Sequence, residues 1–486
     1  MTLLQSMGNF LEELEFKEVA PVAPAAKLRL LDTVGCIVFS ASLPYVRQMS
    51  REFVTSSGPY GVMGHAGGTS SVGDSAFLHG FMVYAYELAG TGAWGGSTGS
   101  IVPAAISATQ YLAARDDSRI SGRDFLRAFV GAAEIQMRLA EWVGFATERY
   151  VGWHTPAFHG AVGASAVTAA LMGLDATTSA HAMAIAADMA GGGLIHSRNN
   201  SKRAHMGRTP ASGILSAILA RDGLEGGLDV LEDPRWGYRR TLLYGTESLT
   251  DVPGNPLDGL GSRFDALSKV SVKYYPFHSA AQSILDNMAE LHRQRPELTV
   301  SDVASITVGL STFMFEHGAM LKPAASLADT NFSFPYAAAL GFVFEPRRLS
   351  EDGASARLFL DGYSNPDVAS LQQRVRCESS DVLDAENPYT MDTTLRVDLV
   401  DGNTISTRTS FGEASRARGK GAIEFGAQGD EAILTKFDNL TVPALGETRA
   451  RELREAILNL DALEDVTDVW RIAYVDVKSI STGDPR

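Results

Sequence analysis

The sequence predicts a mainly α-helical protein that carries a smaller α/β domain. Between residue 23 and about residue 221, apolar residues recur at helical spacing, and the alternation typical of strands is hard to find. After about residue 262, short alternating stretches appear between helical ones. The 486 residues also exceed what one hydrophobic core usually supports. We therefore expect a large all-helical domain over residues 1–265, completed by about 430–486, and a smaller α/β domain over residues 266–429.

The first half of the chain is predicted to form a helical bundle. Its abundant Gly and Ala residues suit closely packed helices. One helix has a recognisable start, because Asp175 and the Thr177-Thr178-Ser179 run can cap a first turn. The predicted helices are residues 27–39, 75–88, 101–113, 122–145, 159–172, 177–190 and 210–220.

The second half contains the predicted strands. Residues 303–310 alternate between apolar and polar side chains, and residues 393–400 and 403–409 flank Asp401-Gly402. Both turn residues tolerate a positive φ, so this pattern predicts a β-hairpin. Residues 280–293 and 334–344 are predicted as helices between the strands. A further helix is expected over residues 447–458, where the chain is predicted to return to the helical domain.

Composition narrows the possible partners and compartment. The formal net charge of −15 argues against nucleic-acid binding, which needs a broad basic surface. Residues 1–17 lack a basic leader followed by an apolar stretch, so we expect a cytoplasmic protein without a secretory signal. Residues 28–43 come closest to a membrane span, but Arg29 and Asp32 favour a buried helix, so we expect no membrane partner. Cys36 and Cys377 have no CxxC spacing and predict structural burial rather than a disulfide or a zinc site.

A dense group of cationic and polar residues lies at 196–208. It follows one apolar helical run, residues 180–190, and precedes another, residues 211–220. Such a stretch could bind a small anion or could be a solvated basic loop, and both interpretations stay open on this pattern alone. The apolar neighbours favour a connection that is fixed to the body of the protein.

Three further motifs contain residues that could form a binding or catalytic site. The glycines of the segment Gly90-Thr91-Gly92-Ala93-Trp94-Gly95 match GxGxxG, but helical periodicity precedes them, whereas a dinucleotide site follows a strand. His154 and His159 are five residues apart with no carboxylate nearby, so they predict no metal site, although one could serve at a helix N-terminus. The segment Lys273-Tyr274-Tyr275-Pro276-Phe277-His278 is either a binding loop at a domain boundary or an ordinary linker.

Taken together, these stretches resemble the MmgE/PrpD family, which includes 2-methylcitrate dehydratase, cis-aconitate decarboxylase and iminodisuccinate epimerase. The resemblance runs over nearly the whole chain. The order and spacing of its motifs carry it: Ala76-Phe77-Leu78-His79-Gly80, Ile101-Val102-Pro103-Ala104-Ala105, Gly152-Trp153-His154, His159-Gly160, Gly173-Leu174-Asp175, Ser201-Lys202-Arg203-Ala204-His205-Met206-Gly207, Lys273-Tyr274-Tyr275-Pro276 and Phe332-Ser333-Phe334-Pro335-Tyr336.

The resemblance implies a large helical domain built from both chain ends, a smaller α/β lid domain and a homodimer that needs no metal or cofactor. It also implies a set of site residues. The catalytic residues that it implies are Lys202, His154, Lys273, His278 and Tyr336, and we add Glu87 as a further candidate. We expect Thr91, Ser97, Arg203, His205 and His159 to bind the substrate.

Two departures from the family pattern concern the chemistry. The family's acidic Asp-x-Asp-Asp-Thr run reads Glu87-Leu88-Ala89-Gly90-Thr91 here, so only the first acid and the threonine remain. The family's following His-Pro pair is Ser97-Thr98, which removes a proposed general acid or base. We therefore expect proton transfer to fall to His154, His278, Tyr336 or Glu87, or to a lysine that is neutral because other cations crowd it.

The expected function is that of a cofactor-independent lyase or isomerase. It would abstract a proton next to a carboxylate or carbonyl of a small carboxylated substrate, with dehydration, decarboxylation or epimerisation as the outcome. Two alternatives stay open. One is a diverged enzyme for a larger or less acidic substrate in secondary metabolism, and the other is a non-catalytic homologue that binds a ligand or an assembly partner.

Overall fold

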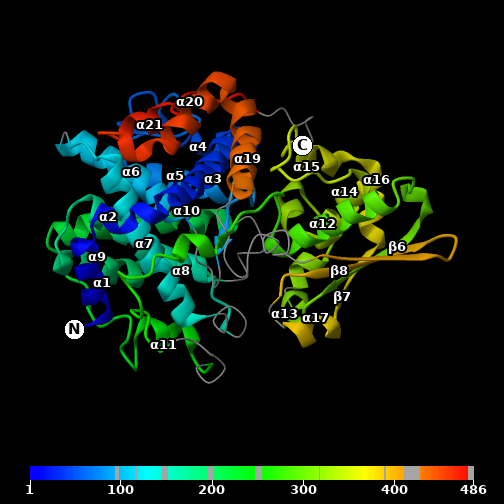
Figure 1. Ribbon diagram of the computed structural model, residues 1–486, viewed down its shortest axis with the longest axis horizontal. Helices are drawn as coiled ribbons and strands as arrows, with labels where there is room; N and C mark the ends of the chain where they lie inside the picture. Colours follow the sequence, from blue (N-terminus) through cyan, green and yellow to red (C-terminus); the bar gives the residue numbers. More distant parts are fainter. Residues whose placement is uncertain are drawn as a thin grey trace.

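The computed structural model describes residues 1–92, 98–116, 118–144, 151–193, 201–246, 254–316, 318–387, 390–409 and 427–479. A large group of helices forms one side of the molecule and a smaller α/β part forms the other (Figure 1). This arrangement confirms the predicted fold class. We propose the boundaries near residues 265 and 430 as the limits of the two domains.

The larger part is built around helices that bury almost every side chain. Helix α8 is buried along nearly its whole length and packs against α6, α7, α9 and α10. Small residues permit this contact, because a Cβ at Gly163 would lie 2.4 Å from Oε1 of Gln136 and one at Gly213 would lie 2.4 Å from Cβ of Ala164. The helices of this part are α1 (Leu3–Glu13), α2 (Phe16–Val19), α3 (Ala23–Ala41), α4 (Pro44–Ser50), α5 (Val72–Ala85), α6 (Ile101–Asp116), α7 (Gly122–Val143), α8 (Thr155–Leu171), α9 (Ala176–Met189), α10 (Ser201–Arg221) and α11 (Tyr238–Leu243).

The C-terminal helices pack on the helical part. They are α19 (Ala427–Leu445), α20 (Glu447–Leu458) and α21 (Thr467–Arg471). Both α19 and α20 lie against α3, and α21 lies against α6 (Figure 1). Trp470 of α21 is fully buried, and its ring centroid lies 5.4 Å from that of Phe125. The first helices and the last helices that the structure describes therefore belong to the same helical body.

The smaller part is a four-stranded sheet with helices on one face. The strand order is β7-β6-β8-β9, with β6 and β7 parallel and the other pairs antiparallel. Helix α14 packs on β6 and β7, and α12 packs on β8 and β9. The elements are α12 (Ser279–Gln294), β6 (Val303–Leu310), α13 (Thr312–Phe315), α14 (Phe334–Val343), α15 (Leu358–Asp361), α16 (Pro366–Leu371), β7 (Val375–Ser379), α17 (Asp381–Glu386), β8 (Thr393–Leu399) and β9 (Thr404–Thr409).

Short strands complete the structure. In the helical part, β1 (Val54–Thr55), β3 (Gly68–Thr69) and β2 (Tyr60–Gly61) form a small antiparallel sheet in that order. Strands β4 (Thr91–Gly92) and β5 (Val270–Ser271) pair with each other. This second pair joins two chain segments that contribute side chains to the candidate site.

Several predicted boundaries were wrong. Helix α10 starts at Ser201 rather than at residue 210, because Pro210 lies inside the helix instead of opening it. Helix α8 starts at Thr155 rather than at residue 159, with Pro156 in its first turn. Helix α5 ends at Ala85 rather than at residue 88, since Glu87 adopts a left-handed φ of 55°. Helix α7 ends at Val143, and residue 145, the predicted end, lies outside the described residues.

The predicted hairpin was confirmed, with Gly402 at a φ of 89° between β8 and β9. Among the helices that the structure describes, none combines the length and the hydropathy that a membrane crossing requires. Arg29 and Asp32 of α3 are buried within the helical part. Both cysteines are free thiols, Cys36 buried and Cys377 half-buried.

Candidate active site

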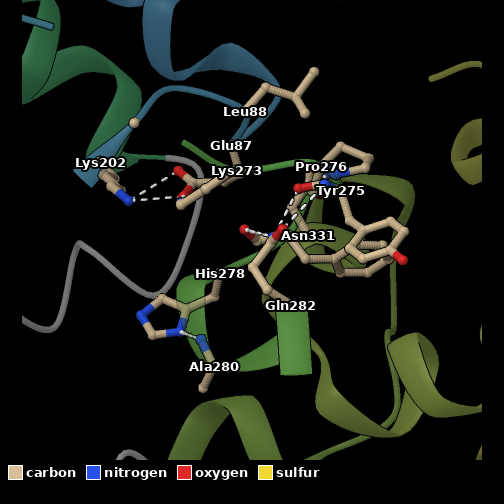
Figure 2. A network of polar contacts seen from close by, with 12 residues as sticks. Glu87, Leu88, Lys202, Lys273, Tyr275, Pro276, His278, Ala280, Gln282 and Asn331 are labelled. Atoms are coloured by element: carbon tan, nitrogen blue, oxygen red, sulfur yellow. Dashed lines mark hydrogen bonds and ion pairs between the residues drawn. The ribbon is translucent and has the colours of Figure 1, made fainter. Parts of the chain in front are cut away.

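The candidate site is organised around one buried carboxylate between two lysines. Nζ of Lys202 lies 2.9 Å from both carboxylate oxygens of Glu87 and donates a hydrogen bond to Oε2. Nζ of Lys273 donates to the same Oε2 at 3.2 Å. The three residues are between 1% and 7% exposed. Figure 2 shows the Glu87 carboxylate directed at Lys202, with Lys273 alongside.

The backbone fixes Glu87 in this position. The left-handed conformation at residue 87 costs roughly 1–2 kcal/mol for a residue other than glycine and turns the chain sharply after α5. Lys436 of α19 then donates to the Leu88 carbonyl at 2.9 Å, and the Gly90 N–H donates to Asp32 of α3 at 3.2 Å. Lys436 and Asp32 are themselves a buried ion pair, with Nζ and Oδ1 2.5 Å apart. Helices from both chain ends therefore hold the segment that carries Glu87.

The buried cluster shifts the pKa values of Glu87 and Lys273. Burial alone would raise the pKa of Glu87, but Lys202 and Lys273 outweigh this effect and lower the pKa to about 2. Burial lowers the pKa of Lys273 to about 8, although Glu87 partly opposes the shift, and Lys202 adds to it. Glu87 is thus a fixed negative charge at neutral pH, while Lys273 lies close to the range in which it can exchange a proton.

Arg203 links α10 to the smaller part. Its Nη2 donates to Oδ1 of Asn331 at 3.1 Å, and its guanidinium lies over the ring of Tyr45, 5.2 Å from the centroid. The side-chain amide of Asn331 donates to the Pro276 carbonyl, and its backbone carbonyl accepts a hydrogen bond from the His278 N–H at 2.9 Å. Asn331 therefore connects Arg203 to the loop that follows Lys273. Figure 2 shows Asn331 beside Pro276 of this loop.

Two histidines form a hydrogen-bonded pair beside the lysines. His154 is the N-cap residue of α8, as expected for a polar residue at a helix N-terminus. Its Nδ1 lies 2.8 Å from Nε2 of His205, in the second turn of α10. Burial, followed by the charges of Lys202, His205 and His278, lowers the pKa of His154 well below its usual range. His154 is therefore a neutral imidazole at physiological pH.

The structure places the remaining predicted residues as follows. His278 is the N-cap residue of α12, and its Nδ1 accepts a hydrogen bond from the Ala280 N–H at 3.3 Å (Figure 2). Thr91 is half-buried in β4, opposite Ser271. Ser97 and residues 196–200 lie outside the described residues.

Two predicted residues are engaged in core contacts instead of contacting the lysines. Nδ1 of His159 is 2.9 Å from the Tyr238 hydroxyl, and burial lowers the pKa of His159 to about 3. The Tyr336 hydroxyl donates to the Phe359 carbonyl at 2.9 Å, and burial raises the pKa of Tyr336. These contacts give both residues a packing role in this structure.

Four residues of the site were not singled out from the sequence: Asn331, Tyr45, Asp32 and Lys436. Asn331 stands directly before the predicted Phe332-Ser333-Phe334-Pro335-Tyr336 motif, which was its only signal. Asp32 and Lys436 are charged residues of opposite sign within apolar helical runs, and such residues are rarely buried unless they are paired. Because 404 residues separate them in the sequence, the pattern did not indicate that they pair with each other.

Two features of the described residues bear on the metal and dinucleotide interpretations of the sequence. Within them, no group of three or more His, Cys, Asp or Glu side chains is arranged to hold a metal ion. Gly90 to Gly92 follow a helix and enter β4, so the strand that a dinucleotide loop requires does not precede them. The remainder of that motif lies outside the described residues.

Comparison with known proteins agrees with this architecture. Residues 5–248 match the MmgE/PrpD N-terminal domain, and residues 275–462 match the MmgE/PrpD C-terminal domain. Cis-aconitate decarboxylase of Aspergillus terreus is 25% identical over 393 residues, which cover 79% of this chain and 77% of the relative. A cis-aconitate decarboxylase-like protein of Aspergillus oryzae is 24% identical over 483 residues, or 95% of each chain. Mouse cis-aconitate decarboxylase is 24% identical over 360 residues, covering 69% of this chain and 66% of the relative. The chain therefore belongs to the MmgE/PrpD family.

Proposed function

We propose that the protein is a cofactor-independent lyase or isomerase that transfers a proton at a carbon beside a carboxylate of a small substrate with two or three carboxyl groups. The observation that carries the proposal is the buried pair of Lys202 and Lys273 around Glu87, with Arg203 next to it. The similarity to proteins named cis-aconitate decarboxylase supports the same substrate class.

The charges of this cluster suit an anionic ligand. Lys202 and Lys273 share the single carboxylate of Glu87, so the two buried lysines carry one positive charge more than their common partner. A buried charge is costly unless an opposite charge compensates it, so a carboxylate of the ligand would complete the cluster. The same cations would stabilise the negative charge that develops when a proton or CO₂ leaves the neighbouring carbon.

The proton itself is best carried by His154 or Lys273. His154 is neutral and can accept a proton, and the pKa of Lys273, lowered to about 8, leaves a fraction of its amine neutral at pH 7. Glu87 is a weak base, because its pKa is lowered to about 2. We therefore assign Glu87 to holding the lysines and leave His278 as an alternative proton carrier.

The test is an NMR panel in D₂O. The protein would be incubated with cis-aconitate, citrate-like and aspartate-like acids, and C–H exchange and product formation would be followed with and without a chelator. We expect exchange or turnover of at least one acid that chelation leaves unchanged. A strict requirement for added metal, or binding of these acids without exchange, would contradict the proposal.

Lys202→Ala is the decisive variant. Loss of a preorganised charge contact costs ~3 kcal/mol, or roughly a hundredfold in rate. Lys17→Ala is the matched control, since the Lys17 side chain is 76% exposed and pairs with Glu15 on the surface. Near-normal turnover by Lys202→Ala would remove Lys202 from the mechanism.

A second candidate function is a related reaction on a larger or less acidic substrate. Gly90 stands where the family pattern has an acid, and Ser97 stands where it has a histidine. Both changes remove bulk and polar groups from that segment. Monocarboxylates and esters added to the NMR panel would test this candidate, and their turnover in the absence of any turnover of di- and tricarboxylates would favour it.

A further inference from the structure

Lys273 and His278 stand on either side of a buried turn. Residues 274–277 between them adopt neither helix nor strand, and all four are buried. A buried backbone N–H or carbonyl is costly without a hydrogen-bond partner, and irregular backbone cannot supply its own partners as a helix does. The partners of this turn come mainly from two buried side-chain amides, those of Gln282 and Asn331 (Figure 2).

Gln282, in the first turn of α12, holds most of this turn. Its Oε1 accepts hydrogen bonds from the N–H groups of Tyr274 and Tyr275, both at 3.0 Å. Its Nε2 donates to the carbonyls of Tyr275 at 2.8 Å and of Phe277 at 3.2 Å. A side-chain amide offers two N–H donors and a carbonyl oxygen with two lone pairs. Gln282 therefore spends its whole hydrogen-bonding capacity on the turn.

Asn331 holds the end of the turn and ties it to the helical part. Its side-chain amide donates to the Pro276 carbonyl, and its backbone carbonyl accepts a hydrogen bond from the His278 N–H at 2.9 Å. Its Oδ1 accepts from Nη2 of Arg203 at 3.1 Å, and Arg203 directly follows Lys202 on α10. One buried side chain thus connects the turn to the helix that carries Lys202.

The chain that enters the turn is fixed as well. Strand β5 ends two residues before Lys273 and pairs with β4, which follows the segment that carries Glu87. Nζ of Lys273 donates to Oε2 of Glu87 at 3.2 Å. At the other end of the turn, His278 is the N-cap residue of α12. The backbone is therefore held both before Lys273 and between Lys273 and His278.

Building on the function proposed above, we propose that Gln282 and Asn331 are positioning residues whose amides fix the turn at 274–277, so that Lys273 and His278 reach the substrate together with Lys202. Both amides act through the residues that they hold. A group that exchanges a proton must lie within hydrogen-bond reach of it, and a displacement of about 1 Å can cost roughly a hundredfold in rate. The two amides therefore set the rate of the chemical step without contacting the substrate.

The test replaces each amide by a neutral side chain of similar size, in Asn331→Leu and Gln282→Met. Both variants remove hydrogen bonds to the turn and add no charge near Lys273. On whichever acid the NMR panel shows to be turned over, we expect kcat to fall at least about tenfold. NMR of labelled lysine should also show the titration midpoint of Lys273, near pH 8 in wild type, rising by about one pH unit or more, because burial lowers this pKa and a displaced lysine gains contact with water.

Asn287→Leu is the matched control. Asn287 lies on the same helix as Gln282 and is fully buried, but its amide donates to the backbone carbonyl and the hydroxyl of Thr393, at 3.1 Å and 3.0 Å. The control should lower the free energy of unfolding in urea, yet leave kcat and the titration midpoint of Lys273 unchanged. Equal losses of kcat in all three variants would indicate a merely structural role and would overturn the proposal.

The remaining outcomes separate the positioning role from the proposed function. Wild-type kcat, or an unchanged midpoint of Lys273, in a folded Asn331→Leu or Gln282→Met variant would overturn the positioning role. Hydrogen–deuterium exchange of the wild type does not depend on whether the variants fold: the N–H groups of residues 274, 275 and 278 should exchange slowly, and rapid exchange would also overturn it. Failure of wild type to act on any acid would refute the proposed function alone, since the exchange and the lysine titration need no substrate.

Discussion

Replacing Glu87 by Gln should destabilise the protein strongly, because its carboxylate is the counter-charge of two buried lysines. The pKa of Glu87 lies at about 2 in the folded protein, against an ordinary value of 4.5. At ~1.4 kcal/mol per pKa unit, the carboxylate contributes ~3 kcal/mol of stability at neutral pH. Removing one partner of a buried ion pair costs a similar ~3–5 kcal/mol.

The sign of the pH dependence is fixed by the direction of that shift. A carboxylate whose pKa is lowered by folding stabilises the protein above its unfolded pKa, and the stabilisation disappears as the pH falls through the folded value. The stability difference between wild type and Glu87→Gln should therefore be full at pH 7 and shrink between about pH 4.5 and pH 2.

Urea unfolding at a series of pH values, followed by circular dichroism, measures this difference. The matched control is Glu386→Gln, which removes a carboxylate that pairs with Arg408 on the exposed surface. The control should change stability little at any pH, because water screens such pairs. A Glu87→Gln variant as stable as wild type at pH 7, or a deficit that stays constant down to pH 2, would refute the argument from the buried cluster.

Three further predictions follow from the same contacts. Lys436→Met should lower the free energy of unfolding in urea by ~3–5 kcal/mol, because it removes the ion-pair partner of Asp32 in the core. A variant as stable as wild type would contradict this prediction. NMR of labelled lysine should show Nζ of Lys273 titrating near pH 8. The contribution of Lys273 to the free energy of unfolding should then rise between about pH 8 and pH 10.5, because in this range the unfolded chain holds the proton and the folded protein does not. A titration midpoint at the ordinary value near 10.5 would contradict this prediction. Gly80→Ala should destabilise by ~1–3 kcal/mol, since its Cβ would lie 2.6 Å from Pro210. Gly73→Ala in the same helix is the control, since a Cβ there would contact only Oγ of Ser71, at 3.4 Å, and the change should not destabilise the protein. Equal effects of the two changes on the free energy of unfolding would contradict the steric argument.

Much of the fold could be predicted from apolar spacing and turn residues. The helix at Glu447–Leu458 and the hairpin around Gly402 matched their predictions, because both depend on local patterns. The parallel strand at Val375–Ser379 was not predicted, since Arg376 and Glu378 lie on an exposed edge and interrupt the apolar signal. The early start of α10 was missed because proline usually opens a helix, whereas here tertiary packing accommodates Pro210 in its interior.

The site was predictable in its parts but not in its pairing. Lys202, Lys273 and Glu87 were singled out from motifs, and the sequence could not reveal that one carboxylate holds both lysines. The pairing depends on the left-handed turn at residue 87. A glutamate does not predict this conformation, because residues other than glycine rarely adopt a positive φ. The sequence also did not reveal that the ring of His159 pairs with the Tyr238 hydroxyl in the core, and its predicted role in substrate binding stays a prediction.

The pair of Asp32 and Lys436 has a consequence for how the protein is made. Lys436 follows Asp32 by 404 residues in the sequence, and the same lysine donates to the Leu88 carbonyl. A growing chain therefore cannot fix the Glu87 segment until α19 has left the ribosome, and contacts of such long range fold slowly. A polypeptide truncated before α19 would lack Lys436, so both Asp32 and the Leu88 carbonyl would lose this partner and the segment that carries Glu87 would be less firmly held.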